Sequence, residues 1–142
     1  MARVDFYVLG SSGAAARQRF ACRLAEKAYR QDNSVLIRVA DSQTARLLDD
    51  LLWTFRDGSF VPHEITDTES QGSGSPIRIG VDGTAQIESD LLINLTNNVP
   101  GDTSSFARVA EIVTSDEESK SLSRERFVAY RDAGHELESH KL

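Results

Sequence analysis

The sequence VLIRV at residues 35–39 is a nearly continuous apolar run. A strand that packs on one face alternates apolar and polar side chains, whereas a strand buried on both faces is apolar almost throughout. Strands of the second kind occur in parallel sheets that helices cover on both sides. We therefore expect residues 35–39 to form an inner strand of such a sheet.

Helical patterns flank this run on both sides. Before it, apolar residues recur at helical spacing at Phe20, Ala21, Leu24, Ala25 and Ala28. After it, Asp41 is the expected N-cap of a second helix that ends near Trp53. The apolar stripe of that helix is Ala45, Leu48 and Leu52. A first strand at residues 4–9 completes an alternation of strands and helices, which implies a parallel sheet covered by helices.

The remaining segments extend this pattern. We predict strands at residues 77–79, 91–95, 107–113 and 135–137, and a helix at residues 116–133. The expected fold class is a three-layer α/β/α arrangement with a mostly parallel central sheet, helices on both faces and a Rossmann-like topology. A length of 142 residues with 39% hydrophobic content suits a single domain over residues 1–142. Within it, the acidic and Gly/Ser-rich residues 64–76 are expected to form a flexible loop.

The charge of the chain bears on the class of partner. A net charge of −6 argues against direct binding of nucleic acid, because contacts to phosphates need a basic footprint. The charge is uneven, since residues 64–90 hold six acids against one base, whereas residues 120–131 hold four bases against one acid. A local basic patch on an acidic protein suits a short acidic peptide better than DNA. Direct nucleic-acid binding through this patch is a less favoured alternative.

The compartment follows from what the chain lacks. No apolar run reaches the roughly 20 residues of a membrane span, and no signal-peptide pattern begins the chain. We therefore expect a cytoplasmic protein without membrane contact. Cys22 is the single cysteine, and without metal-spaced partners it is expected to be a small residue of the core or its flank.

The turn LGSSGA at residues 9–14 lies where a nucleotide-binding protein would hold phosphate at a helix N-terminus. It lacks the Lys-Ser or Lys-Thr pair of a Walker loop and the spacing Gly-x-Gly-x-x-Gly, so a structural turn is the favoured interpretation. A nucleotide-binding enzyme that uses Gly10 to Gly13 is the main alternative. The sequence shows no paired spacing of metal ligands and no nucleophile elbow, so we expect no catalytic site, metal or cofactor.

The helix near the C-terminus carries the clearest sign of a binding surface. Ser115 and Glu118 are spaced as a capping box, and Gly134 can end the helix in a left-handed conformation. Helical arithmetic places on the core-facing side Leu122, Ala129, Tyr130 and Ala133. Arg126 falls on the same side, and we expect it to pair with an acid or to extend its charge to the surface rather than to contact a ligand.

The opposite side of this helix combines cations with apolar groups at Arg124, Phe127, Val128 and Arg131. An exposed apolar cluster rimmed by charge marks an interaction site, and an arginine fork binds a carboxylate through two hydrogen bonds. A peptide that ends in a large apolar residue offers both groups, so it fits this surface. A solvated helix with one stray Phe, or a second layer of core packing, would explain the same pattern.

A second cluster of large side chains follows the second predicted helix. Trp53 ends that helix, and Phe60-Val61-Pro62-His63 lies in the segment after it. Two interpretations stand: these residues complete the core, or they anchor a protein interface, where Trp and Phe are enriched. Pro62 favours an extended backbone in either case.

Five segments together resemble one known family. They read FY at residues 6–7, LDDLLW at 48–53, SFVPH at 59–63, DLLINL at 90–95 and RERFVAYRDAGH at 124–135. In this order and spacing, which cover nearly the whole chain, they are similar to the chi subunit of bacterial DNA polymerase III. The resemblance implies a non-catalytic accessory protein of the clamp-loader assembly with a three-layer α/β fold.

Chi subunits bind the acidic C-terminal tail of single-stranded-DNA-binding protein, which ends in an apolar residue. The resemblance therefore implies that Arg124 contacts the tail, with Phe127, Val128 and Arg131 beside it. Family members often have a basic side chain where this chain has Val128, so one charge toward the tail is expected to be absent here.

Chi subunits also pair with the psi subunit of the polymerase. By resemblance, Trp53 and Phe60 match positions of the psi contact, within a segment that continues through Val61, Pro62 and His63. A DNA-repair helicase can use an overlapping surface in this family. The resemblance thus implies a bridge between two protein partners.

Overall fold

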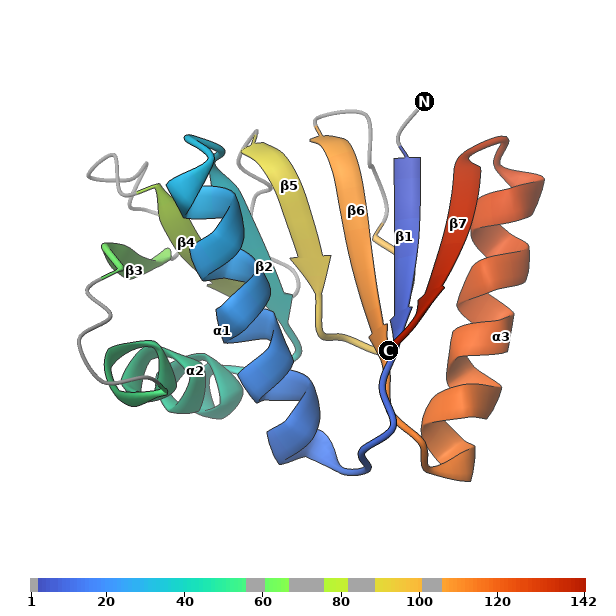
Figure 1. The fold of residues 1–142 in the computed structure, drawn as a ribbon, viewed down its shortest axis with the longest axis horizontal. Helices are drawn as coiled ribbons and strands as arrows, with labels where there is room; N and C mark the ends of the chain where they lie inside the picture. Colours follow the sequence, from blue (N-terminus) through green and yellow to red (C-terminus); the bar gives the residue numbers. More distant parts are fainter. Residues whose placement is uncertain (1–2, 56–60, 67–75, 82–88, 101–105) are drawn as a thin grey trace.

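The computed structural model describes residues 3–55, 61–66, 76–81, 89–100 and 106–142 (Figure 1). In chain order the elements are β1 (Arg3–Val8), α1 (Ala14–Arg30), β2 (Val35–Val39), α2 (Ser42–Thr54), β3 (His63–Thr66), β4 (Ile77–Val81), β5 (Ser89–Asn94), β6 (Phe106–Val113), α3 (Glu117–Asp132) and β7 (Glu136–Lys141). Each predicted strand and helix is present, and β7 is longer than predicted. The strand β3 was not predicted, so the assignment of residues 64–66 to a flexible loop is wrong, whereas residues 67–75 of that loop lie outside the described residues.

The seven strands form one sheet in the order β3-β4-β2-β5-β6-β1-β7, and every neighbouring pair is parallel. Helices α1 and α2 lie on one face of the sheet, and α3 lies on the other, beside the edge strand β7 (Figure 1). The predicted three-layer α/β/α class is therefore confirmed. No helix in the described ranges is long and apolar enough to cross a membrane.

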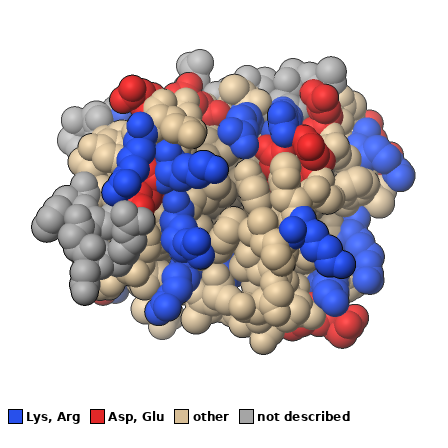
Figure 2. All heavy atoms as spheres, in the orientation of Figure 1, with Lys and Arg blue, Asp and Glu red and all other residues tan. Residues whose placement is uncertain are grey.

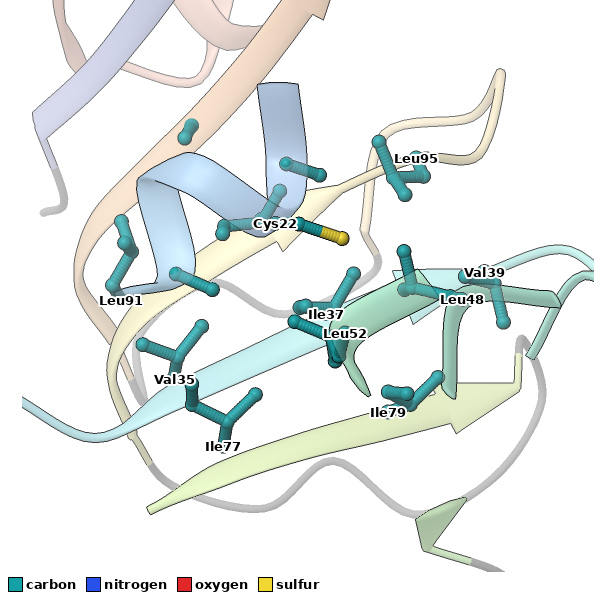
Figure 3. Close-up of a cluster of buried hydrophobic side chains, with 14 of the residues drawn as sticks. Cys22, Val35, Ile37, Val39, Leu48, Leu52, Ile77, Ile79, Leu91 and Leu95 are labelled. Atoms are coloured by element: carbon teal, nitrogen blue, oxygen red, sulfur yellow. The ribbon is translucent and has the colours of Figure 1, made fainter. Parts of the chain in front are cut away.

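The larger part of the core lies between the sheet and the helices α1 and α2. Figure 3 shows Cys22 of α1 and Leu48 and Leu52 of α2 in one cluster with Ile37 of β2 and Ile79 of β4. Cys22 is fully buried, which confirms its assignment to the core.

The strand β2 contributes to both faces of the sheet. Val35, Ile37 and Val39 pack under α1 and α2, whereas Leu36 belongs to the smaller cluster on the face of α3. This arrangement explains why its sequence is apolar nearly throughout, because both faces of an inner parallel strand are removed from water. The prediction made from residues 35–39 is confirmed.

An aspartate caps each of the helices α2 and α3. Asp41 caps α2 by accepting a hydrogen bond from the backbone N–H of Thr44 at 2.7 Å, as predicted. For α3 the predicted capping box is wrong, because Asp116 rather than Ser115 is the N-cap and accepts from the N–H of Ser119 at 3.2 Å. Asp116 also accepts from the hydroxyl of Thr114 at 2.6 Å, which holds its carboxylate over the helix end.

Candidate protein-binding site

The sheet-facing side of α3 differs from the predicted one. Its buried residues are Ser123, Arg126 and Tyr130. Of the four residues predicted to face the core, Tyr130 does so, Leu122 is half-buried, and Ala129 and Ala133 are exposed. Phe127, which was predicted to face outward, is half-buried with its ring centroid 5.4 Å from that of Phe6 on β1.

A buried acid on β6 accounts for this roll of the helix. Glu111 accepts hydrogen bonds from Nε of Arg126 at 3.0 Å, from the hydroxyl of Tyr130 at 2.6 Å and from Nδ2 of Asn94 at 2.8 Å. A buried carboxylate without such partners would cost several kcal/mol, so the helix turns Arg126 and Tyr130 toward it. The expectation that Arg126 pairs with an acid is confirmed. Burial raises the pKa of Glu111, which the charge of Arg126 and these hydrogen bonds oppose.

A groove of about 390 Å³ lies between α3 and the strands β1 and β7. Its lining combines apolar side chains with three cations: Phe6, Val8, Val113 and Phe127 are apolar, and Lys120, Arg124 and Lys141 are basic. Opposed apolar and cationic groups in one concave surface match a ligand that carries an apolar side chain beside a carboxylate. We call this surface the α3 groove.

Two of the four residues that were predicted to bind a tail peptide lie at the α3 groove, and two do not. Arg124 and Phe127 line the α3 groove, whereas Val128 and Arg131 are not among its lining residues. The side chain of Arg131 is 61% exposed, with Nε 3.5 Å from the carboxylate of the neighbouring Asp132, and Val128 is 43% exposed.

Sequence reasoning missed several residues of the α3 groove. Phe6 and Lys141 belong to strands at opposite ends of the chain, which meet because β1 pairs with β7 in parallel. Phe6 lies opposite Ser139 in that pairing, two residues before Lys141. Lys120 was noticed only as part of the local basic patch. The strand order alone could have found Phe6 and Lys141.

The second predicted cluster contains both packing residues and exposed residues. The side chain of His63 is buried, with Nδ1 2.7 Å from the carbonyl oxygen of Val61 and Nε2 3.1 Å from the carbonyl oxygen of Asp49 on α2. Val61 is also buried, so these two residues complete the core, which was one of the two interpretations. Trp53 is 55% exposed and its ring packs against that of His63, with centroids 4.5 Å apart. Pro62 is exposed.

Phe60, the remaining predicted member of this cluster, lies outside the described residues. A further apolar side chain is exposed nearby in the sequence, since Ile65 on the edge strand β3 is 39% exposed. Trp53, Pro62 and Ile65 therefore supply the apolar area that a partner can cover at this end of the sheet. We call this surface the Trp53 surface.

The turn at Gly10 to Gly13 offers a poor site for phosphate. Gly13 is the N-cap of α1 and has a φ of +92°, a backbone conformation that favours glycine. Its backbone N–H donates to the carboxylate of Asp116 at 3.3 Å. Hydrogen bonds from Thr114 and from this N–H lower the pKa of Asp116, so the group is negative at neutral pH. A negative charge at the position of a phosphate opposes the nucleotide-binding alternative.

One group of potential metal ligands occurs in the described part of the chain, at Asp5, Glu138 and His140. The carboxylate of Asp5 already accepts from Nε of Arg3 at 3.2 Å and Nη2 of Arg108 at 3.1 Å, and it lies 2.9 Å from Nε2 of His140. Two guanidinium groups against the same carboxylate disfavour a cation there. The group is therefore explained as an ion-pair network that joins β1, β6 and β7.

Comparison with known proteins covers the whole chain. Residues 1–138 match the family described as "DNA polymerase III chi subunit, HolC". DNA polymerase III subunit chi of Pseudomonas aeruginosa is 40% identical over 142 residues, which is 100% of this chain and 98% of that protein. The corresponding protein of Escherichia coli is 32% identical over 142 residues, with 96% of each chain covered.

Two solved structures share the fold at low sequence identity. T4 UvsW matches with a TM-score of 0.69 and 9% identity over 99% of this chain and 41% of that chain. Dbp5 of S. cerevisiae, solved in complex with Gle1 and IP6, matches with a TM-score of 0.62 and 15% identity over 98% of this chain and 42% of that chain. These two matches support the α/β/α class alone. The match of the family over residues 1–138 and the identity to two relatives along nearly their full length show that the chain belongs to the family of DNA polymerase III chi subunits, accessory subunits in DNA replication.

Proposed function

We propose that this protein is a non-catalytic adaptor that links single-stranded-DNA-binding protein to the clamp loader of DNA polymerase III. In this proposal the α3 groove binds the acidic C-terminal tail of single-stranded-DNA-binding protein, and the Trp53 surface binds a psi subunit. The observation that carries the proposal is the α3 groove itself, in which apolar side chains lie beside Lys120, Arg124 and Lys141.

The chemistry of the α3 groove suits the end of an acidic peptide. The planar guanidinium of Arg124 can hold a terminal carboxylate through two hydrogen bonds, and Lys120 and Lys141 add point charges beside it. An apolar terminal side chain would then pack against Phe127 and Phe6, which removes its surface from water. Both parts of the ligand are therefore satisfied in one concave surface.

Val128 and Arg131 have a different role in the proposal. Both are exposed on α3 outside the α3 groove, so they meet the residues that precede the terminal one in the tail. Arg131 attracts the acids of that segment through solvent, where each charge pair is worth little and salt weakens it. Val128 adds apolar contact only.

The Trp53 surface lies at the opposite end of the sheet from the α3 groove. β3 and β7 are the two edge strands of a seven-stranded sheet, and six steps of about 4.8 Å separate them by roughly 29 Å. Two partners can therefore bind without collision. In the proposal psi covers Trp53 and Pro62, whereas His63 and Val61 support these contacts from the core, and a DNA-repair helicase competes with psi for the same surface.

Tethering is the mechanism that follows from two separated surfaces. An adaptor that holds the tail at one end and the clamp loader at the other raises the local concentration of the loader at coated single-stranded DNA. Base contacts are unnecessary, in keeping with the net charge of −6. The proposed role belongs in the bacterial cytoplasm.

A pair of variants tests the proposal. A fluorescein-labelled acidic peptide that ends in a free Phe carboxylate is titrated into the wild type, Arg124→Ala and Trp53→Ala, and the same three proteins are assayed for co-purification with psi. We expect Arg124→Ala to weaken the peptide about fivefold or more and to retain psi. Trp53→Ala should show the reverse.

Amidation of the peptide's C-terminus is the matched control for the terminal carboxylate. It should weaken binding to the wild type more than binding to Arg124→Ala, because the variant has already lost the partner of that group. Equal affinity of the wild type and Arg124→Ala for the free-acid peptide would remove the α3 groove from the proposal. Loss of both activities in a single folded variant would argue against two separate surfaces.

A further inference from the structure

The face of the sheet that carries α1 is incompletely covered. α1 packs on β2, β5 and β6, and among the described helices none lies in front of β1 and β7 in Figure 1. The side of α1 and the uncovered strands therefore meet at a step. This step lies on the opposite face of the sheet from the α3 groove.

A large hollow occupies the step. It has a volume of about 660 Å³, and its apolar lining consists of Tyr7, Phe20, Leu24, Phe55 and Leu142. A second hollow of about 310 Å³ shares Tyr7, Leu24 and Lys27 with the first, so the two form one continuous depression along α1. We call this depression the α1 groove. Tyr7, Leu24 and Lys27 line both of its parts.

Three cations form the helical wall of the α1 groove. They are Arg19, Arg23 and Lys27, each four residues after the one before. All three are exposed, and none makes an ion pair with another described residue. Glu26, which also lines the hollow, lies 3.8 Å from Nη2 of Arg30. Figure 2 shows a column of basic side chains over the position of α1 in Figure 1. The wall is therefore positive on a protein whose net charge is −6.

The ring contacts of Tyr7 argue against nucleic acid as the ligand. Nucleic acid strands that bind without base pairing stack their bases on free aromatic faces. The ring of Tyr7 is stacked on that of His140 with centroids 5.1 Å apart, and it packs against Phe20 at 5.4 Å. Both neighbours of Tyr7 thus belong to the protein itself, so the ring at the junction of the two hollows is not free to stack on a base.

The spacing of the cations matches an extended peptide. Four helical residues rise about 6 Å, so Arg19 and Lys27 are about 12 Å apart along α1. An extended chain presents side chains of one face every 6.6 Å or so. Acids at three alternate positions of a five-residue segment can therefore pair with the three cations in register, while the two residues between them face the apolar floor.

We propose that the α1 groove is a second protein-binding site, which takes an extended acidic segment with apolar side chains at alternate positions. The segment lies along α1, with its acids toward Arg19, Arg23 and Lys27 and its apolar side chains toward Tyr7, Phe20 and Leu24. Its recognition needs no free C-terminus, in contrast to the ligand of the α3 groove. The two sites lie on opposite faces of the sheet and bind independently.

The test uses a pentapeptide of alternating aspartate and phenylalanine that is acetylated and amidated, so that it lacks a terminal carboxylate. Backbone amide NMR of the isotope-labelled full chain follows its titration, with a fifteen-residue oligothymidylate in a parallel titration. The variants are Arg23→Glu in the α1 groove, Arg124→Glu in the α3 groove, and Arg46→Glu, the same charge change at an exposed position of α2.

We expect the peptide to shift the amides around Phe20, Leu24 and Tyr7, and Arg23→Glu to weaken it about three- to tenfold. Arg124→Glu and Arg46→Glu should leave its affinity within a factor of two. Shifts confined to the α3 groove, an unchanged affinity of Arg23→Glu, or no shifts at millimolar peptide would each overturn the proposal. Tighter binding of oligothymidylate at the same amides would overturn it in favour of a nucleic-acid site.

Discussion

Arg126 of α3 and Glu111 of β6 form an ion pair of 3.0 Å in which both side chains are almost completely buried. The pair joins the outer helix to an inner strand and decides which side of α3 faces the sheet. It thereby sets the positions of Arg124 and Phe127 at the α3 groove, although neither of these two residues is among the hydrogen-bond donors to Glu111. The surface that we propose for the tail depends on a contact below it.

Removal of one partner from this ion pair should be costly. Arg126→Ala leaves the carboxylate of Glu111 buried with only Tyr130 and Asn94 as donors, so we expect the free energy of unfolding to fall by about 3–5 kcal/mol. Urea unfolding followed by circular dichroism measures the change. Arg124→Ala, one of the exposed positions of the same helix, is the control and should change stability by less than about 0.5 kcal/mol. Similar midpoints for the two variants would show that the buried pair does not hold α3.

Asp5 predicts a dependence of stability on acid pH. Burial raises the pKa of its carboxyl, but hydrogen bonds from His140 and Arg108 and the charges of Arg108 and Arg3 lower it more, so the net pKa lies below the ordinary value of 3.8. A carboxyl whose pKa is lower in the folded state stabilises the fold above its unfolded pKa, and this contribution disappears as the pH falls through the folded pKa.

The variant Asp5→Asn isolates this contribution. It should lower the free energy of unfolding at pH 7 by about 1–3 kcal/mol, because hydrogen bonds to charged groups are lost. The difference from the wild type should begin to shrink below about pH 4. Thermal unfolding of both proteins between pH 7 and pH 2.5 measures it, and a difference that grows toward low pH would contradict the assignment.

Cys22 should report the opening of the larger core. Its side chain lies on α1 and is fully buried against the sheet, and burial raises the pKa of the thiol to about 12. Thiolate is the reactive form, so a thiol reagent at pH 8 should label the native protein far more slowly than the protein in urea. Because Cys22 is the single cysteine, mass spectrometry gives the labelled fraction directly. Native labelling as fast as that of a free thiol would mean that α1 is not packed on the sheet.

Val128 allows the electrostatic part of the proposed tail site to be increased. Val128→Arg adds a cation on the exposed side of α3, and we expect it to tighten the acidic tail peptide about two- to fivefold at low salt. The gain should vanish near 0.5 M salt, where charges at the surface are screened. Val128→Met changes size without charge and should leave the salt dependence unaltered. A gain that persists in high salt would point to packing instead of charge.

Local patterns were sufficient for the elements of the fold. The apolar run at residues 35–39 is buried on both faces of the sheet, and Asp41 caps the helix after it. Both features could be predicted because each leaves a pattern in neighbouring positions of the sequence. The exception is β3, whose residues 63–66 have no apolar alternation and become a strand by pairing with β4. The pairing of two strands is a tertiary contact, and the sequence of a four-residue segment does not predict it.

The candidate site was only partly predictable for the same reason. The sequence identified Arg124 and Phe127 because both lie on one helix, where spacing translates into position. It misassigned the outward direction of Phe127, because the roll of α3 depends on Glu111 across the layer boundary. It missed Lys141, which reaches the α3 groove only because β7 lies beside β1.

The sequence by itself thus determined the parallel α/β class, the order of the helices and strands apart from β3, and the family, since these follow from local periodicity and from matched segments along the chain. The tertiary structure alone decided which residues form each surface. It brought β1 and β7 together, turned Arg126 inward and left a cationic step beside α1. The physical reason is that burial of a charge and pairing of distant strands are balanced over the whole molecule, and no window of sequence contains both partners.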